Sequence, residues 1–457
     1  MVLSLVSFGY LTRTLQPETY GVLAWGLALL GYFSAVTELG LGTLYVREVA
    51  RAPSRIRELA GWLFAMRVVL VTVSFAGYVA VVTWVDRPLT FKLALVVLGM
   101  GLVASGGAVD WVYLGTHRIG RLAVRNVFVA LLVLVGAVLA VGGPEDVVMA
   151  AAVLTASALI GNAALALAFV TEYGWVRPQI DLTAWRPLLR SAVPIGLALF
   201  LMQIYGTIDQ VMLGMYRPDT ELGWYASAFK ILTAIFVVDH VLQQVFLPTL
   251  AEAPPSTEAG RSRGQEYVGA LAALGIPLAL GVAAYPGDLL VFFAGEAYRS
   301  GAPALLVLSF FAVVVYVSKA WGDSLVAWGH ERSFLRAVAA AAFINIVLNV
   351  MLIPPYGPMG AASSTLVSGI AAAVGMALPY RRLVGTLHGP LLARVIAASA
   401  SGVILPVLGV RTLGGTVWVA ALVALPTYIS AAYFFGIVPA SVRNAVAARF
   451  YGNSASS

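Results

Sequence analysis

The chain has 457 residues, of which 60% are hydrophobic and only 11% are charged, and its mean hydropathy is +0.91. Soluble domains carry about 25% charged residues, so this composition excludes a soluble enzyme and a disordered protein. The absence of cysteine excludes disulfides, iron–sulfur clusters and thiol catalysis, and the four histidines form no metal-binding motif. In a soluble protein, a net charge of +7 would suggest binding to nucleic acid. In a membrane protein it reflects basic residues in cytoplasmic loops, so we expect no nucleic-acid partner.

Thirteen segments are long and apolar enough to cross a membrane as helices, which needs about 20 residues. These segments are 20–46, 61–85, 91–114, 122–141, 147–171, 187–213, 222–250, 267–285, 302–328, 334–353, 359–380, 391–410 and 415–436. The stretch MVLSLVSFGYL before Arg13 is too short to cross unaided, and we interpret it as the outer half of a first span. A misplaced start codon would explain this, and a tilted helix is the alternative. The expected fold is therefore an all-α membrane protein of about fourteen helices.

The distribution of Lys and Arg predicts the orientation of the chain. With the N-terminus in the cytoplasm, nineteen basic residues lie in inner segments or at the inner ends of spans, six lie in outer segments or at the outer ends, and three lie deeper within spans. Such an excess marks the cytoplasmic side, so we expect both termini there and a location in the cell membrane. The longest outer loop, at about 286–301, is too short to hold a catalytic domain.

A faint repeat divides the chain. An Asp is followed seven residues later by a His at 110–117 and again at 323–330, an offset of 213, and Gly-Pro pairs occur at 143–144 and 357–358. Near the start, Tyr20-Gly21 resembles Leu222-Gly223 at an offset of 202. Chance similarity between apolar sequences is the alternative interpretation. A repeat would be a sign of internal duplication and should be sought early in any sequence.

The repeat predicts three parts: a six-helix bundle at 1–175, a second at 176–385, and two extra helices with a cytoplasmic tail at 386–457. Because each half has an even number of spans, the halves should be related by an axis along the membrane normal. Transporters of this design bind substrate between the halves and rock them around it.

Nine ionisable residues lie well inside predicted spans, away from the span ends, where a charge costs roughly 2.5–3.5 kcal/mol and normally faces a cavity or a partner. They are Glu38, Arg67, Asp110, Asp209, Lys230, Asp239, His240, Lys319 and Asp323. We expect the first three to form one cluster near the inner ends of their spans. Structural ion pairs that only hold helices together are the alternative interpretation.

The remaining residues in this set suggest pairs and proton carriers. Asp209 and Lys230 lie at similar depth and can pair, while Lys319 and Asp323 are four apart and share a helix face. Arg67 is a candidate for binding a phosphate through two parallel hydrogen bonds from its guanidinium group. The adjacent Asp239 and His240 can carry a proton, since imidazole titrates near neutral pH, and a structural histidine is the alternative.

Short motifs in order along the chain resemble a known family. They are Arg13-Thr-Leu-Gln-Pro-Glu-Thr-Tyr-Gly21, Glu38-Leu-Gly-Leu-Gly42, Arg47-Glu-Val-Ala-Arg51, Ile208-Asp-Gln-Val-Met-Leu-Gly214 and Gly223-Trp-Tyr-Ala-Ser-Ala-Phe-Lys230. Together with the layout of six, six and two spans, they resemble the Wzx-type polysaccharide-biosynthesis flippases. The superfamily of these proteins also contains the lipid II flippases and the MATE drug exporters. The resemblance covers nearly the whole chain, and the shortened first span departs from it.

The resemblance implies a flippase that moves a polyprenyl-diphosphate-linked oligosaccharide across the membrane by alternating access, without a cofactor. It implies that cavity cations hold the diphosphate, and Arg67, Lys319 and Lys230 are the candidates, with Arg13 and Arg47 at the two mouths. Coupling to protons or sodium would use Glu38, Asp110 or the acidic and histidine residues of the second half: Asp209, Asp239, His240 and Asp323. Partners would be membrane lipid and polysaccharide assembly machinery.

Three rival functions are open. A MATE-like cation antiporter usually lacks the last two spans and needs an acidic cavity, and a lipid II flippase is poorly separated by sequence. A membrane polysaccharide polymerase or ligase would be expected to carry a large outer loop with catalytic Arg or His, but segment 286–301 carries only Asp288, Glu296 and Arg299 as charged residues.

Overall fold

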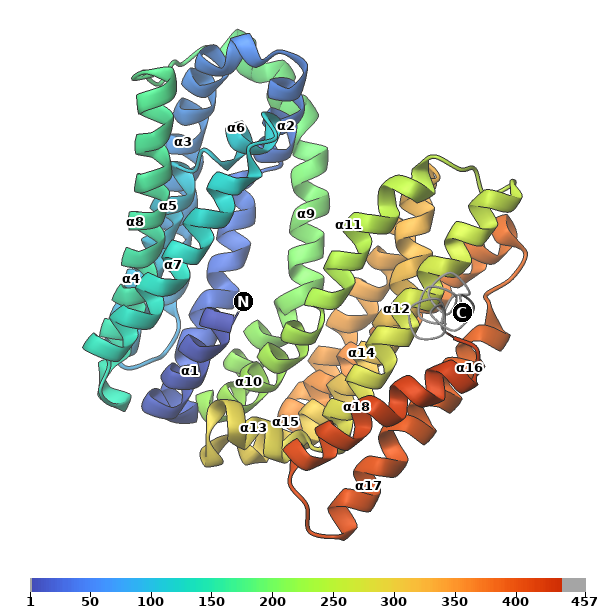
Figure 1. Cartoon of the computed structure of the whole chain (residues 1–457). Helices are drawn as coiled ribbons and strands as arrows, with labels where there is room; N and C mark the ends of the chain where they lie inside the picture. The colour runs from blue at the N-terminus through green and yellow to red at the C-terminus, as the bar shows by residue number, and fades with distance from the viewer. Residues whose placement is uncertain (1, 438–457) are drawn as a thin grey trace, which may run out of the picture. The chain divides into compact units, whose positions relative to one another are not determined.

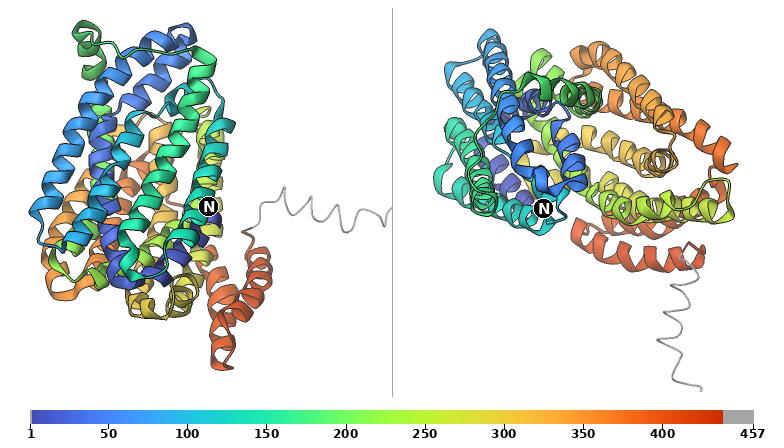
Figure 2. Two further views of the ribbon diagram at one scale, coloured as in Figure 1. Left: turned by 90° about the vertical axis from the view of Figure 1, so that its left-hand side faces the viewer. Right: turned by 90° about the horizontal axis from the view of Figure 1, so that it is seen from above.

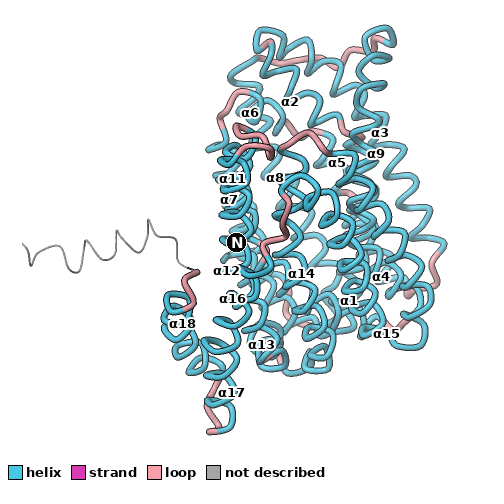
Figure 3. The backbone as a smooth tube through the Cα atoms, turned by 90° about the vertical axis from the view of Figure 1, so that its right-hand side faces the viewer, coloured by secondary structure: helices cyan, strands magenta, loops and turns pink. Residues whose placement is uncertain are grey.

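The structure, a computed structural model, describes residues 2–437. Every regular element in this part of the chain is helical, and Figure 3 shows helices joined by short loops with no strand among the described residues. Hydrocarbon offers no water to backbone amides and carbonyls, and helices satisfy these groups within one segment. Arg443, Arg449 and the rest of the predicted tail at 438–457 lie outside the described residues.

Twelve helical stretches of the described chain are long and apolar enough to cross a membrane, and the protein is a multi-pass membrane protein. Two of these helices are interrupted: α1 (Val2–Glu38) leaves helical geometry at Gln16, and α15 (Glu331–Val384) does so at Gly357. A proline follows each break, and proline cannot donate the backbone hydrogen bond that would continue the helix. Dividing α1 and α15 at these breaks gives fourteen apolar segments, in agreement with the expected number of about fourteen.

The chain forms two compact units. Unit 1 comprises Met1–Ser227, Val291–Arg299 and Leu348–Ala361. Its long helices, blue to green in Figures 1 and 2, run side by side, and α1 packs against α3, α7 and α9. Besides α1, its elements are α2 (Leu41–Arg51), η1 (Pro53–Arg55), α3 (Ile56–Trp84), α4 (Leu89–Gly99), α5 (Gly101–Gly106), α6 (Asp110–Gly115), α7 (Ile119–Ala140), η2 (Pro144–Asp146), α8 (Val147–Tyr173), α9 (Leu182–Tyr216) and the start of α10 (Asp219–Ile235).

Unit 2 comprises Ala228–Leu290, Ser300–Val347 and Ala362–Ser457. Its central helix is α12, which packs against α11, α14 and α16, while α17 packs against α18. The elements that begin in the second part of the chain are α11 (Val237–Ala251), α12 (Glu258–Ala284), α13 (Pro286–Ala294), η3 (Glu296–Gly301), α14 (Ala302–Ala327), α15, α16 (Gly389–Ser399), the π-helical turn η4 (Ala400–Ile404), α17 (Leu405–Thr412) and α18 (Val417–Phe434).

Several helix ends follow ordinary capping chemistry. Asp181 precedes α9 and accepts hydrogen bonds from the amides of Thr183 and Ala184 at 3.0 and 3.1 Å. Hydrogen bonds from the Thr183 side chain and these amides stabilise the carboxylate, so they hold the pKa of Asp181 below its usual range. At the other end of a long helix, Gly385 follows α15 with φ 87°, the left-handed conformation that suits glycine.

The structure corrects three predicted boundaries. The predicted span 20–46 is too long, because Leu39 and Gly40 adopt left-handed conformations and end α1 at Glu38. The predicted span 91–114 is divided among α4, α5 and α6, so Asp110 lies in the first turn of a short separate helix. The predicted outer loop 286–301 is mostly helical, since α13 and η3 occupy it.

Two glycines that the predicted repeat aligns, Gly21 and Gly223, allow α1 and α10 to approach closely within unit 1. A Cβ atom on Gly21 would lie 1.9 Å from the carbonyl oxygen of Asp219, and one on Gly223 would lie 1.9 Å from that of Pro17. Pro17 and Asp219 are separated by the same 202 positions as the two glycines. The contact is therefore reciprocal, as in a two-fold interface.

A second local structure also recurs. A left-handed residue follows α6 and α14 at the same distance, His117 with φ 57° and Gly329 with φ 76°. In both cases the next amide donates to the carbonyl five residues back at 2.7 Å, which is a Schellman cap. The caps are 212 positions apart, one fewer than the predicted offset, so Asp110 and Asp323 are not equivalent positions.

We expect Gly223→Ala to destabilise the protein because its methyl group would collide with a backbone carbonyl. Overpacking of this kind costs about 1–3 kcal/mol. The matched control is Gly206→Ala in α9, where an added Cβ meets no atom within 4 Å and alanine favours the helix by about 1 kcal/mol. Thermal unfolding of the purified protein in detergent should show a lower Tm for the first variant only. Equal Tm values for the two variants would contradict the close crossing.

Candidate functional site

Arg67 is buried near the end of α1 in unit 1, and its side chain is only 4% exposed. One guanidinium nitrogen donates to Glu38 Oε2 at 2.8 Å, and another donates to the carbonyl of Ala108. The other Glu38 oxygen accepts from the amide of Gly42 at 2.7 Å. Arg67 Nε has no hydrogen-bond partner within the described residues, so the guanidinium retains one unused donor.

Asp110 does not join Arg67 in the predicted cluster but forms a second one. Its two carboxylate oxygens accept from Arg125 at 2.8 and 2.9 Å, which is a bidentate pair. Arg125 also donates to Asn162 at 2.7 Å, and Asn162 donates to the carbonyl of Ala104 at 3.1 Å. Arg125 is one of the nineteen inner basic residues and lies at the start of predicted span 122–141, and its spacing of fifteen residues from Asp110 is no helical signal.

A third cluster lies in unit 2 on α11, α12 and α14. Lys319 pairs with Asp239 at 3.7 Å rather than with Asp323. Asp323 accepts instead from the hydroxyl of Tyr267 at 2.6 Å and from Gln243 at 2.9 Å. One ammonium and two carboxylates leave a formal charge of −1 when both carboxyl groups are ionised. This cluster can therefore accept a proton or a small cation more readily than the neutral pairs around Arg67 and Arg125.

Sequence reasoning missed a buried ion pair in unit 1. Arg87, in the loop after α3, lies 2.6 Å from Asp219 Oδ1, and the Arg87 side chain is 7% exposed. It also donates to the carbonyl of Gly214 at 2.8 Å and lies 4.7 Å from the ring centre of Trp25. Arg87 lies between the predicted spans 61–85 and 91–114 on the outer side, where arginines are usually solvated, so its sequence position carries no sign of burial.

The other predicted residues are scattered. Asp209 is buried and accepts from the hydroxyl of Tyr225 and from the amide of Gln210. Arg13 donates to the carbonyl of Phe292 at 2.5 Å, and the exposed Arg47 lies 3.9 Å from Glu48. His240 is exposed beside Asp239.

Lys230, in α10, differs from the other predicted cations. Its side chain is exposed, and within the described part of the chain its ammonium has no ion-pair or hydrogen-bond partner. Ionisable residues in membrane spans almost always face a bundle interior or a watery cavity rather than lipid. Lys230 is therefore the predicted cation most available to an anionic ligand. Across residues 2–437 no three His, Asp or Glu side chains gather as metal ligands would.

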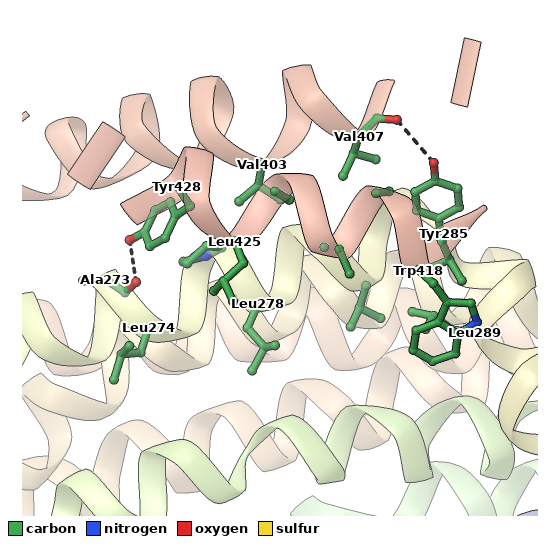
Figure 4. A pocket seen from close by; sticks show the side chains of 17 residues that line it. Ala273, Leu274, Leu278, Tyr285, Leu289, Val403, Val407, Trp418, Leu425 and Tyr428 are labelled. Carbon is green, nitrogen blue, oxygen red and sulfur yellow. Dashed lines mark hydrogen bonds between the residues drawn. The ribbon is translucent and has the colours of Figure 1, made fainter. Parts of the chain in front are cut away.

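Unit 2 also contains an apolar groove of about 390 Å³ between α12 and the pair formed by α17 and α18. No charged side chain lines it. Figure 4 shows Leu274 and Leu278 on α12 facing Leu425 on α18. Tyrosine hydroxyls donate across its two ends, from Tyr428 to the carbonyl of Ala273 at 2.5 Å and from Tyr285 to that of Val407 at 3.3 Å. The groove suits a hydrocarbon chain.

We expect Arg87→Met to lower the free energy of unfolding by about 3–5 kcal/mol, because it leaves Asp219 buried without a counter-charge. The control is Arg55→Met, which removes an ion pair with Glu58 whose two side chains are 48% and 45% exposed. Exposed pairs contribute about 1 kcal/mol or less. Thermal unfolding of both variants in the same detergent provides the measurement. Similar losses of stability in the two would show that the Arg87 pair does not hold unit 1 together.

Comparison with known proteins identifies the family. The sequence model of the family described as "Polysaccharide biosynthesis protein" matches residues 1–253, more than half of the chain. The "Putative O-antigen transporter" of Escherichia coli is 20% identical over 376 residues, which are 80% of this chain and 89% of that protein. The "Probable flippase AglR" of Haloferax volcanii is 26% identical over 224 residues, 46% of each chain. The solved structure of the lipid II flippase MurJ in an inward closed conformation has the same fold, with a TM-score of 0.70 and 12% identity over 95% of this chain and 96% of MurJ. The chain therefore belongs to the polysaccharide biosynthesis protein family.

Proposed function

We propose that this protein is a flippase that moves a lipid-linked oligosaccharide across the membrane. The observation that carries the proposal is the family match over residues 1–253. The relative from Escherichia coli, whose name refers to O-antigen transport, supports the same substrate class. The protein is a transporter and not an enzyme, and its multi-pass helical fold provides the scaffold that such transport needs.

The physical problem is to carry a sugar and phosphate head group through hydrocarbon while its lipid anchor stays in the bilayer. We propose that 1–175 and 176–385 act as two related bundles that alternate in access, with 386–457 as an added pair of helices and tail. The reciprocal contact of Gly21 and Gly223 supports a two-fold repeat, and the even number of spans in each half would place its axis along the membrane normal. Rocking of repeats around a fixed site is the usual mechanism of such folds.

The substrate we propose is polyprenyl-diphosphate-linked, and its diphosphate needs cations. Lys230 is the first candidate because its ammonium has no partner to displace within the described residues. Arg67 and Lys319 are already paired with carboxylates, so the diphosphate would have to replace Glu38 or Asp239 there. Arg13 and Arg47 are exposed and would act at the mouths.

We propose that the groove between α12 and the pair α17 and α18 receives part of the isoprenoid chain. Its volume is about 390 Å³ and its lining is apolar, which suits isoprene units but gives the hydroxyls of a sugar head group almost no hydrogen-bond partners. Before binding, both the groove wall and the isoprenoid contact lipid chains rather than water. Binding therefore removes no apolar surface from water, and affinity depends on shape and packing rather than on the hydrophobic effect.

Energy coupling is proposed at the acidic cluster of unit 2. Lys319 pairs with Asp239 but not with Asp323, so one carboxylate of the cluster has no counter-charge, and a proton or sodium ion would neutralise it. His240 next to Asp239 and Asp209 in unit 1 are further candidates. Glu38 and Asp110 are candidates only in a state in which their ion pairs with arginine are broken. We place both termini in the cytoplasm and the protein in the cytoplasmic membrane, since nineteen of 28 basic residues fall in inner segments. Polysaccharide assembly enzymes would supply and consume the substrate.

The test is reconstitution of the full chain in vesicles with a polyprenyl-diphosphate-linked oligosaccharide, measuring delivery to the opposite leaflet. Delivery above protein-free vesicles is expected. Parallel vesicles with lipid II address the function suggested by the likeness to MurJ, and vesicles loaded with an organic cation address the MATE-like function. Movement of the organic cation without movement of either lipid would overturn the proposal. Imposed proton or sodium gradients in the same vesicles test coupling.

We expect Lys230→Met to slow delivery about ten- to hundredfold, because a hydrogen bond to a charged group is worth about 1.5–3 kcal/mol. Lys92→Met is the matched control, since the Lys92 ammonium only donates to the carbonyl of Thr83 at 3.1 Å. Unchanged delivery in Lys230→Met would remove Lys230 from the site. Unchanged delivery in the double variant Arg67→Ala, Lys319→Ala would remove those two cations, provided that both variants keep the wild-type Tm.

Filling the apolar groove should impair transport of long-chain substrate. Gly281 lines the groove and an added Cβ there meets no atom within 4 Å, so we expect Gly281→Leu to fold normally and to place its side chain in the groove. Gly409→Leu, also in open space but outside the groove, is the control. We expect slower delivery of the polyprenyl substrate in the first variant and no change with a short-chain analogue. Equal loss with both chain lengths would show that the groove does not hold the chain.

A further inference from the structure

A second groove, of about 500 Å³, lies on unit 1 between α7 and α8 and has a different chemical character. Residues on one face of each helix form its walls, because they recur at intervals of three or four. These residues are Arg121, Arg125 and Phe128 on α7 and Ala164, Leu165 and Ala168 on α8. The small alanines of α8 leave the space open.

One end of this groove is polar and carries an excess of positive charge. Arg118 and Arg121 both bind the carboxylate of Glu172, the second at 2.6 Å, and both remain about half exposed. Arg57 donates to the carbonyl of Tyr173 at 2.7 Å, which places a third guanidinium at the same helix end. Three guanidiniums and one carboxylate leave two net positive charges there.

The rest of the groove is apolar. Deeper in it, Arg125 is neutralised by Asp110 and also donates a hydrogen bond to Asn162. Val124 beside Arg125 and Phe128 beyond it are 71% and 40% exposed on a membrane-spanning helix, where acyl chains are their neighbours. Positive charge at the mouth followed by a hydrocarbon wall matches one molecule that has a phosphate at one end and acyl chains at the other.

We propose that this groove binds an anionic phospholipid, with its phosphate on Arg118 and Arg121 and an acyl chain along Phe128. Basic pockets between membrane helices bind anionic head groups, and each cation near the surface adds to the attraction. A zwitterionic phospholipid brings no net charge to the mouth and gains less. None of the cations proposed for the diphosphate lines this groove, so the inference does not rest on the proposed function.

The test uses the purified full chain in detergent, titrated with phosphatidylglycerol or phosphatidylcholine and followed by Tm and by native mass spectrometry of retained lipid. Wild-type protein should prefer phosphatidylglycerol. The double variant Arg118→Gln, Arg121→Gln should bind it about thirtyfold more weakly, from the loss of two surface cations. Arg381→Gln, Arg382→Gln at the end of α15 makes the same charge change elsewhere and should bind as wild type.

A second variant guards against misfolding, because the arginine variant leaves Glu172 without partners. Ala164→Phe keeps every charge and places a ring in the groove from an exposed position. It should also lose retained phosphatidylglycerol. Wild-type retention in both variants, equal retention of the two lipids, or equal weakening in the α15 control would overturn the proposal. A Tm shift with inorganic phosphate equal to that with phosphatidylglycerol would show an anion site rather than a lipid site.

Discussion

The architecture depends on the cost of leaving a charge unpaired in hydrocarbon. Three arginines, Arg67, Arg87 and Arg125, are largely buried, and each is met by a carboxylate together with a backbone carbonyl or an amide side chain. The carboxylates stand where helices begin or end: Glu38 ends α1, while Asp110 and Asp219 lie in the first turns of α6 and α10. A helix N-terminus favours a negative charge, so these breaks in the helices supply partners that a continuous span would not.

The same constraint explains what the sequence could and could not predict. Long apolar segments revealed the helical fold and nearly every span, because only helices satisfy the backbone in lipid. The partners of the charged residues were harder to predict from the sequence. Arg87 and Asp219 are far apart in sequence, and their meeting depends on the close crossing of α1 and α10 at Gly21, which no periodicity reveals. The early end of α1 depends on the left-handed Leu39, a residue type with no preference for that conformation.

The repeat is preserved in backbone geometry more than in charge. Reciprocal packing at Gly21 and Gly223 and the shared cap beyond α6 and α14 are matched features of the two halves. The ionisable residues are not matched, since Asp110 is neutralised by Arg125 whereas Asp323 is held by a tyrosine and a glutamine beside the Asp239–Lys319 pair. Equivalent folds therefore carry different chemistry, which is why we assign ion coupling to the second half.

The two grooves also differ in chemistry, because one has an apolar lining only and the other combines an apolar wall with arginines. The groove beside α18 has no charged lining residue and cannot compensate a phosphate, so a lipid-linked substrate held there must place its head group elsewhere. We propose Lys230 for that role, since its ammonium has no competing carboxylate within the described residues. The groove beside α7 combines guanidiniums with an apolar wall and can hold a whole phospholipid. A transported lipid should be held in separable parts, because a site that bound head and chain together would release it slowly.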